Sequence, residues 1–452
     1  MKFLHIADVH LGCRRYNLDE RARDFFRAWY DVLQRYALPN RPDFVLIAGD
    51  LFHMRRVDPQ TMNHAIAGLE LLRSKNIPVL VIEGNHDQSD PTSHFSWLRS
   101  LSQWGYLKLL EPQYDESKKL IVTEWDEKRR RGSFIDIGGA RIFGSNWYGM
   151  SANAVLPLLA EQIKPHISSE RFNILMLHTD IEGYLKRPIP ALTQARLREL
   201  RGMIDYVALG HTHKEFNFDN WAFNPGSLEA CTVDEYDEPR GFYMVEVRDH
   251  KAEAQHIRDY VQRPIQRLSV EISGSADPEM VRARILELVE REARVHDESS
   301  GELAPIVEVT LRGRLGFRTS LLETNALREQ IQERTRALHV IIRNLTIPVE
   351  YQVGDQFDPS LPRHERERRI LEDLVTRDAR YRDRAGDVAN LIMEAKRLAL
   401  EEEAPERIIE FIAQKLGLES DDDGANVQNG VEESIADSRL VLFGPRRRID
   451  HE

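Results

Sequence analysis

Five short and almost continuous apolar runs in the first half of the chain constrain its fold most strongly. They are KFLHIA, DFVLIAGD, PVLVIEGNHD, FNILMLH and YVALGH, at residues 2–7, 43–50, 78–87, 172–178 and 206–211. Runs this short and rich in β-branched residues predict strands that are buried on both faces. Helical patterns separate them, at 20–38, 61–76 and 191–202 among others. This alternation predicts an α/β domain built from layers of helix and sheet.

Each of these predicted strands ends in a polar side chain that can bind a metal ion. The residues are Asp8 and His10, then Asp50, then Asn85, His86 and Asp87, then His178, and finally His211 and His213. One strand-end histidine or Gly-Asp pair is more often structural than functional, but the ordered set is not explained in that way. Because ligands bind at the carboxyl ends of strands in α/β sheets, these side chains are expected to meet.

The ligand types predict the chemistry of this site. Carboxylates, imidazoles and an amide suit manganese or iron, while magnesium and zinc remain open because ligand type alone does not fix the metal. Two divalent ions about 3.5–4 Å apart can activate a water and stabilise the leaving oxygen of a phosphoester. Asp50 is the best candidate for a carboxylate between the ions. Cys13 and Cys231 lie in no CxxC motif, so we expect nitrogen and oxygen ligands only.

The remaining chain predicts further segments. We expect a first domain at 1–260, with Gly138 and Gly139 in a hairpin turn, and a small β-α-β-α-β domain at 261–355. Two amphipathic helices fall within 363–416. Residues 417–438 are acidic and are expected to form a disordered linker, followed by a short segment at 439–452 whose role stays open.

The motif order DxH, GD, GNHD, H and GHxH resembles that of the calcineurin-like metallophosphoesterase superfamily. ADVHLG, GDLFHMRRVDPQT and NPGSLEA further resemble one branch, the SbcD and YhaO type of DNA repair nuclease. These are prokaryotic relatives of the meiotic-recombination-eleven nuclease, and the resemblance covers about residues 1 to 350. It implies an α/β fold with a four-layer β-sandwich flanked by helices, a small α/β capping domain and a helical C-terminal tail.

The resemblance also implies roles for individual residues. One ion would be held by Asp8, His10, Asp50 and His213, and the other by Asp50, Asn85, His178 and His211. His86 would be the acid at the leaving oxygen, oriented by Asp87. His53 matches a position that the family uses at DNA ends, although a structural role fits the sequence equally well. Arg55 and Arg56 are candidate phosphate contacts, with solvated loop arginines as the alternative.

The implied function is a manganese-dependent DNA exonuclease and endonuclease that processes double-strand ends in repair or recombination. The implied partners are double-stranded DNA ends, single-stranded DNA, a second copy of the chain, and an SbcC-type SMC-like ATPase bound by the C-terminal helices. Those helices could instead fold back on the body. The alternatives are a small-molecule or cyclic-nucleotide metallophosphodiesterase and a structural subunit of an ATPase complex.

The amino-acid composition limits the expected location of the protein and the way in which it can bind DNA. The sequence contains neither a long apolar window nor a signal-peptide pattern, so a cytoplasmic, nucleoid-associated protein without membrane contact is expected. The net charge of −12 excludes a uniformly basic DNA binder. A nuclease with this charge needs lysines and arginines gathered near its cleft.

Overall fold

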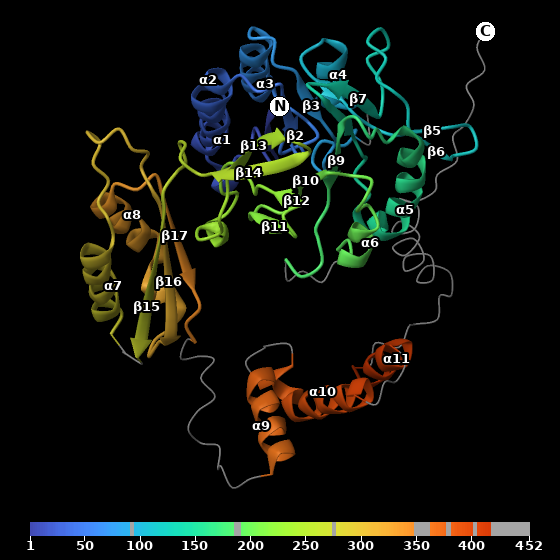
Figure 1. Cartoon of the computed structure of the whole chain (residues 1–452). Coiled ribbons are helices and arrows are strands. Elements are labelled where there is room, and N and C mark those ends of the chain that lie inside the picture. Colours follow the sequence, from blue (N-terminus) through green and yellow to red (C-terminus); the bar gives the residue numbers. More distant parts are fainter. Residues whose placement is uncertain are drawn as a thin grey trace, which may run out of the picture. The chain divides into compact units, whose positions relative to one another are not determined.

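A computed structural model describes residues 1–90, 95–184, 191–273, 277–347, 362–376, 381–400 and 405–416 (Figure 1). The predicted linker at 417–438 and the segment at 439–452 lie outside these residues. Among the residues described, no helix combines the length and apolar character that are needed to cross a bilayer.

The first of two large sheets holds three of the predicted strands. Its order is β14-β13-β1-β2-β3-β4, in which β1 to β4 run parallel and β13 pairs antiparallel with β1. The strands are β1 (Lys2–Ile6), β2 (Phe44–Ile47), β3 (Val79–Val81), β4 (Lys108–Leu109), β13 (Phe242–Arg248) and β14 (Lys251–Ile257). The parallel pairing brings the carboxyl ends of β1, β2 and β3 to the same edge.

The second sheet holds the other two predicted strands and has the order β11-β12-β10-β9-β8-β7. Its strands are β7 (Phe134–Ile137), β8 (Ala140–Phe143), β9 (Phe172–His178), β10 (Tyr206–Gly210), β11 (Phe216–Phe218) and β12 (Ala222–Asn224). β8, β9 and β10 are parallel, so β9 and β10 also end at a common edge. Gly138 and Gly139 form the β7–β8 turn with φ of 59° and 89°, which confirms the predicted hairpin. A small separate sheet pairs β5 (Gln113–Tyr114) with β6 (Leu120–Ile121).

Three apolar layers hold the two sheets and their helices together. Phe44 and Leu46 of the first sheet are buried with Ile174 and Met176 of the second, so the sheets pack face to face. The outer face of the first sheet packs on helices α1 (Asp19–Val32), α3 (Pro59–Arg73) and α4 (Trp97–Gln103). The outer face of the second packs on α5 (Ala152–Ile163) and α6 (Gln194–Arg198). After α1 the chain continues through a π-helical turn, Leu33–Ala37, into α2 (Leu38–Asn40). This arrangement confirms the expected four-layer fold.

The predicted β-α-β-α-β unit forms a three-stranded sheet with two helices (Figure 1). It comprises β15 (Ile265–Ser273), α7 (Pro278–Glu292), β16 (Ile306–Arg314), α8 (Thr324–Thr335) and β17 (His339–Asn344). Just before β15, the buried guanidinium of Arg263 donates to both carboxylate oxygens of buried Asp24 in α1, with Nη2 2.6 Å from Oδ1. A charge pair that is buried with two parallel hydrogen bonds fixes the start of β15 against the first domain.

The helical segment contains α9 (Arg363–Thr376), α10 (Ala385–Leu400) and α11 (Pro405–Leu416). α10 contacts both α9 and α11, as expected for a helical hairpin. By internal contacts, one compact unit holds 1–273, 277–313 and 320–346, and a second holds 314–319 with the helical segment. The domain boundaries expected from the sequence remain a prediction.

Candidate metal centre

The strand-end residues lie on loops that are joined to one another by backbone hydrogen bonds. The N–H of Asp8 donates to the Gly49 carbonyl at 3.1 Å, and the N–H of His10 donates to the Asp50 carbonyl at 3.0 Å. The second sheet is tied in as well, because the N–H of His211 donates to the Asp8 carboxylate at 3.0 Å. The loops are therefore positioned by main-chain contacts before any ion is considered.

Four of the predicted ligands have left-handed backbone conformations. The φ angles are 52° at Asp8, 49° at His10, 54° at Asp50 and 90° at His211. A left-handed backbone conformation costs a residue with a Cβ atom about 1–2 kcal/mol of conformational energy. Residues in such conformations cluster at functional sites. The loops thus turn sharply after their strands, which directs these side chains toward a common volume.

Three glycines make room for two of the buried predicted ligands, His178 and Asp50. A Cβ atom on Gly49, whose φ is 91°, would meet the His178 ring, and one on Gly210 would meet the same ring and the Ala48 carbonyl. A Cβ atom on Gly84 would overlap the Asp50 carboxylate. In the Gly-Asp and Gly-Asn-His-Asp patterns, a ligand therefore follows a glycine that leaves space for a ligand from another strand.

The first predicted ligand set converges around buried His10. Its Nε2 lies 3.0 Å from His213 Nε2, 3.9 Å from Asp8 Oδ1 and 3.8 Å from Asp50 Oδ2. Asp8 Oδ1 is also 3.9 Å from His213 Nε2. Neighbouring ligands of an ion that is bonded at about 2.0–2.2 Å lie about 3–3.5 Å apart, so these atoms can reach one ion with small adjustments.

The second predicted set converges around His178. Its Nε2 lies 3.2 Å from Asp50 Oδ2 and 3.2 Å from Asn85 Oδ1. His211 offers a ring nitrogen within 4.8 Å of the ligand atoms of Asp50 and His178. Asp50 Oδ2 faces both sets, while Asp50 Oδ1 accepts the N–H of His86 at 2.9 Å. One carboxylate oxygen therefore stands between two potential ion positions.

Outer contacts orient the imidazoles of these sets. His178 Nδ1 donates to the Ala48 carbonyl at 2.8 Å, so its Nε2 faces the other ligands. His213 Nδ1 lies 3.3 Å from Glu235 Oε1, and His211 Nε2 lies 3.5 Å from Asp180 Oδ2. Neither Asp180 nor Glu235 was predicted from the sequence. Asp180 stands two residues after His178, which is a weak local signal, whereas Glu235 has none.

The titration behaviour of the site reflects carboxylates and imidazoles that are crowded together out of water. Burial, reinforced by the charge of Asp50, raises the pKa of Asp8 to about 6 although nearby histidines oppose the rise. For His178, burial alone would lower the pKa, but the carboxylates of Asp50 and Asp8 raise it to about 9. Burial would raise the pKa of Asp50, yet His178 holds it well below its usual range. Positive charge is therefore favoured between Asp50 and His178, as a proton or a metal ion.

The expectation that Asp87 orients His86 requires a correction. His86 Nδ1 contacts the His53 carbonyl at 2.7 Å, not the Asp87 carboxylate. Asp87 is buried and accepts three backbone N–H groups, from Leu51 at 3.1 Å, Phe52 at 2.9 Å and Gly84 at 3.3 Å. Asp87 therefore joins the loop that follows β2 to the loop that follows β3. It does not aim the His86 ring.

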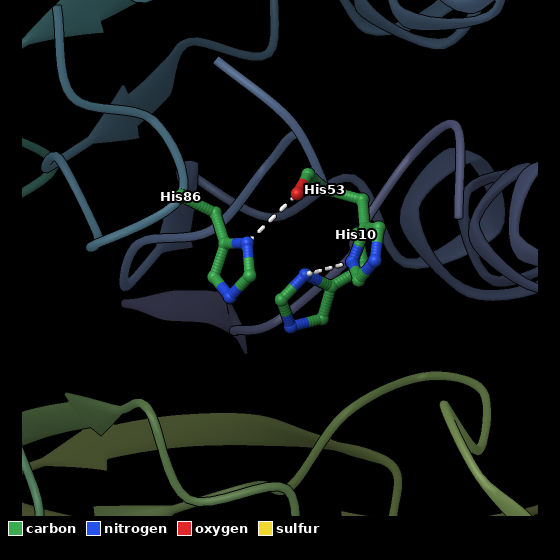
Figure 2. Close-up of side chains that lie close together, drawn as sticks. All are labelled: His10, His53 and His86. Carbon is green, nitrogen blue, oxygen red and sulfur yellow. Dashed lines mark hydrogen bonds between the residues drawn. The ribbon is translucent and has the colours of Figure 1, made fainter. Parts of the chain in front are cut away.

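The three residues expected at the DNA lie in the loop after β2. His53 Nδ1 is 3.3 Å from His10 Nδ1, and Figure 2 shows the rings of His10, His53 and His86 gathered in one cluster. Arg55 Nη2 donates to Gln88 Oε1 at 2.5 Å and contacts the Asn85 carbonyl at 3.5 Å. The largely exposed Arg56 donates to Asp90 Oδ2 at 2.7 Å. Both arginines thus contact the loop that follows β3, and Arg55 also contacts the carbonyl of predicted ligand Asn85.

The proximity of the Cys13 and Cys231 thiols was not predicted from the sequence either. Cys13 and Cys231 are both buried, and each offers its sulfur within 4.8 Å of the other and of a ring nitrogen of His53. The expectation that only nitrogen and oxygen could hold a metal is therefore too narrow for the described residues. Convergence from distant loops carries no local sequence signal, which is why it escaped a motif search.

Comparison with known proteins finds a family model that matches the first part of the chain. Residues 1–215 match the model of the calcineurin-like phosphoesterase family. The DNA double-strand break repair protein Mre11 of Archaeoglobus fulgidus is 34% identical over 255 residues, which cover 55% of this chain and 54% of that protein. The Mre11 protein of Thermoplasma acidophilum is 24% identical over 351 residues, covering 74% of this chain and 82% of that protein.

Among solved structures, the calcineurin-like phosphoesterase YfkN of Bacillus subtilis matches at 14% identity with a TM-score of 0.34, covering 57% of this chain and 88% of that chain. The chain spans about half the length of the Archaeoglobus relative that it matches. The family match and the two convergent ligand sets agree on the first domain. Residues 1–215 therefore match the calcineurin-like phosphoesterase family model, within a chain that is similar in sequence to archaeal Mre11 proteins.

Proposed function

We propose that this protein is a manganese-dependent DNA exonuclease and endonuclease that processes double-strand ends in repair or recombination. The observation that carries the proposal is the position of Asp50 Oδ2, which is 3.8 Å from His10 Nε2 in one ligand set and 3.2 Å from His178 Nε2 in the other. A single oxygen shared by two sets of nitrogen and oxygen ligands is what a two-ion phosphoesterase requires.

The donor set fits two divalent ions. Asp8, His10, Asp50 and His213 would hold one, and Asp50, Asn85, His178 and His211 the other. Bound there, the ions would polarise the phosphoryl oxygen and lower the pKa of the attacking water. Carboxylate, imidazole and amide ligands favour manganese or iron over softer metals.

His86 is the proposed acid for the leaving oxygen. A carbonyl can only accept hydrogen bonds, so the 2.7 Å contact with the His53 carbonyl requires the proton on His86 Nδ1. Nε2 is then the atom that gains and loses a proton, and it is the one available to the leaving oxygen. The His53 carbonyl, not Asp87, would orient this ring.

DNA is the proposed substrate because the relatives are DNA double-strand break repair proteins. His53, Arg55 and Arg56 would engage double-stranded ends and single-stranded DNA. We further propose a homodimer, a cytoplasmic, nucleoid-associated location, and an SbcC-type SMC-like ATPase bound by α10 and α11. The apolar side chains of Leu400 in α10 and Ile409 in α11 are 75% and 66% exposed, and exposed apolar side chains on these helices support the proposed docking of a partner helix.

The test compares linear duplex DNA with bis-p-nitrophenyl phosphate in the presence of manganese, with and without the neighbouring ATPase. Wild-type protein should degrade DNA, and His86→Ala should not. His256→Gln serves as a control, because this half-buried histidine contacts the Pro225 carbonyl in another part of the sheet. If the small ester is cleaved while DNA remains intact even with the ATPase present, the nuclease proposal fails. Parallel reactions with magnesium, iron and zinc test the choice of metal.

A further inference from the structure

Two thiols and an imidazole gather beside the nitrogen and oxygen ligands, and the two thiols have no part in the proposed reaction. Cys13 follows β1, His53 follows β2 and Cys231 follows β12, and their ligand atoms lie within 4.8 Å of one another. Cys13 is fully buried and Cys231 is 7% exposed. Figure 2 shows the His53 ring in the same histidine cluster as His10, so the thiol pair adjoins the predicted ion positions.

Main-chain contacts fix all three residues in place. The N–H of Cys13 donates to the His10 carbonyl at 3.1 Å, and the N–H of His53 donates to the Leu11 carbonyl at 3.0 Å. The N–H of Cys231 donates to Glu235 Oε2 at 2.9 Å, and the other oxygen of that carboxylate contacts predicted ligand His213. Ligands that are held by backbone hydrogen bonds need little rearrangement to bind an ion.

We propose that Cys13, His53 and Cys231 form a third metal site, which is selective for a soft ion and takes Zn²⁺. Thiolate sulfur and imidazole nitrogen prefer zinc and cadmium, whereas manganese and magnesium prefer oxygen ligands. Around tetrahedral zinc, with bonds of about 2.3 Å to sulfur and 2.0–2.1 Å to nitrogen, neighbouring ligands lie roughly 3.5–4 Å apart. Each bound thiol would release one proton to solvent, and water would fill the fourth position.

Simple packing is the competing explanation, because buried cysteines often behave as small apolar residues. The two thiols do share a small apolar cluster with Phe25, separate from the larger cores of the described residues. Packing alone does not require a histidine nitrogen within 4.8 Å of both sulfurs, as His53 has here. A metal site with these three ligands does require such closeness. The geometry therefore favours the metal site over packing alone.

Zinc at this site should also slow DNA cleavage, a consequence that rests on the proposed nuclease function. His53 contacts His10 through its ring and His86 through its carbonyl. An ion bound to the His53 ring would hold it away from DNA and would add positive charge beside the predicted manganese ligands. The site would thus make the enzyme sensitive to zinc that is present together with manganese.

Cobalt(II) spectroscopy on the full-length protein tests the site without any cleavage assay. The sequence has just two cysteines, so a near-ultraviolet band from thiolate-to-cobalt charge transfer can come only from Cys13 and Cys231. Reduced wild-type protein should show this band with an intensity that corresponds to about one thiolate-bound cobalt per chain, and added zinc should remove it. The variant with both Cys13→Ser and Cys231→Ser should lack the band, and His256→Gln should retain it.

Measurements on the wild type keep the proposal testable if the double variant fails to fold. Zinc should slow the reaction of both thiols with a disulfide reagent at least about tenfold. A folded, reduced protein that is saturated with cobalt and shows no thiolate band would overturn the proposed site. So would two thiols that stay equally reactive with zinc, or a pair that is found as a disulfide after purification under reducing conditions.

The cleavage test is separate. With manganese fixed, zinc should inhibit the wild type at a concentration at least about tenfold lower than it inhibits the double serine variant. Equal zinc sensitivity would overturn the link to catalysis. If neither protein cleaves DNA, the proposed nuclease function fails, while the cobalt spectra still decide whether the site exists.

Discussion

Asp87→Asn separates two explanations of the Gly-Asn-His-Asp motif. The Asp87 carboxylate accepts Leu51 and Gly84 N–H groups through Oδ2 and Phe52 N–H through Oδ1. Asparagine retains one acceptor oxygen and replaces the other with an N–H₂ donor. In the better of its two orientations, the oxygen serves Leu51 and Gly84, and the new donor faces the Phe52 N–H.

One buried backbone donor is then left without an acceptor, and this costs about 1–3 kcal/mol of unfolding free energy. Asp87→Ala would leave three donors unpaired, a loss comparable to the whole stability of many domains, so asparagine is the informative change. Because the joined loops carry predicted ligands Asp50 and Asn85, we expect manganese affinity to fall about 10–100-fold, as with other residues that support ligands.

Denaturant unfolding and titration calorimetry with manganese measure the two effects. Asp219→Asn is the matched control, because this half-exposed carboxylate pairs with Arg201 on the surface and its loss should cost less than about 1 kcal/mol. If Asp87→Asn lowers cleavage while stability and manganese affinity stay at wild-type values, Asp87 acts on His86 alone and the loop-joining explanation is refuted.

Three further changes probe other parts of the site. His86→Ala should reduce DNA cleavage about 10²–10⁴-fold while calorimetry still finds two bound ions; activity within tenfold of wild type would exclude it as the acid. Burial lowers the pKa of His5 to about 3, below its usual 6.5, so its stabilising contribution is present above pH 6.5 and declines as pH falls toward 3. The unfolding free energy of wild type should therefore fall about 1.4 kcal/mol per pH unit more steeply than that of His5→Gln in this range; parallel pH profiles would contradict this. Gly84→Ala places a Cβ atom against the Asp50 carboxylate, so calorimetry should find weakened binding of both ions, and unchanged affinity would show that the loop relaxes freely.

The sequence predicted where the strands end more reliably than it predicted which groups touch. Strand ends follow from apolar runs, so Asp8, Asp50 and His178 could be placed at one edge of the fold. The hydrogen-bond partners of His86 and Asp87 could not be predicted, because adjacent side chains in a sharp turn point in different directions. His86 contacts the His53 carbonyl and does not contact Asp87. Glu235 and the pair Cys13 and Cys231 reach the site only through tertiary packing, which leaves no periodic pattern to detect.

The way that the ligands are divided between the sheets has a mechanical consequence. Asp8, His10, Asp50 and Asn85 follow strands of one sheet, whereas His178, His211 and His213 follow strands of the other, and each predicted ligand set draws on both. An ion in either position would link the two halves of the sandwich, which are otherwise held together by apolar side chains and a few hydrogen bonds. Removal of the ions by a chelator should then weaken the contact between the two sheets first. The rate of backbone amide hydrogen exchange should rise along β1 and β10 before it rises in the outer helices.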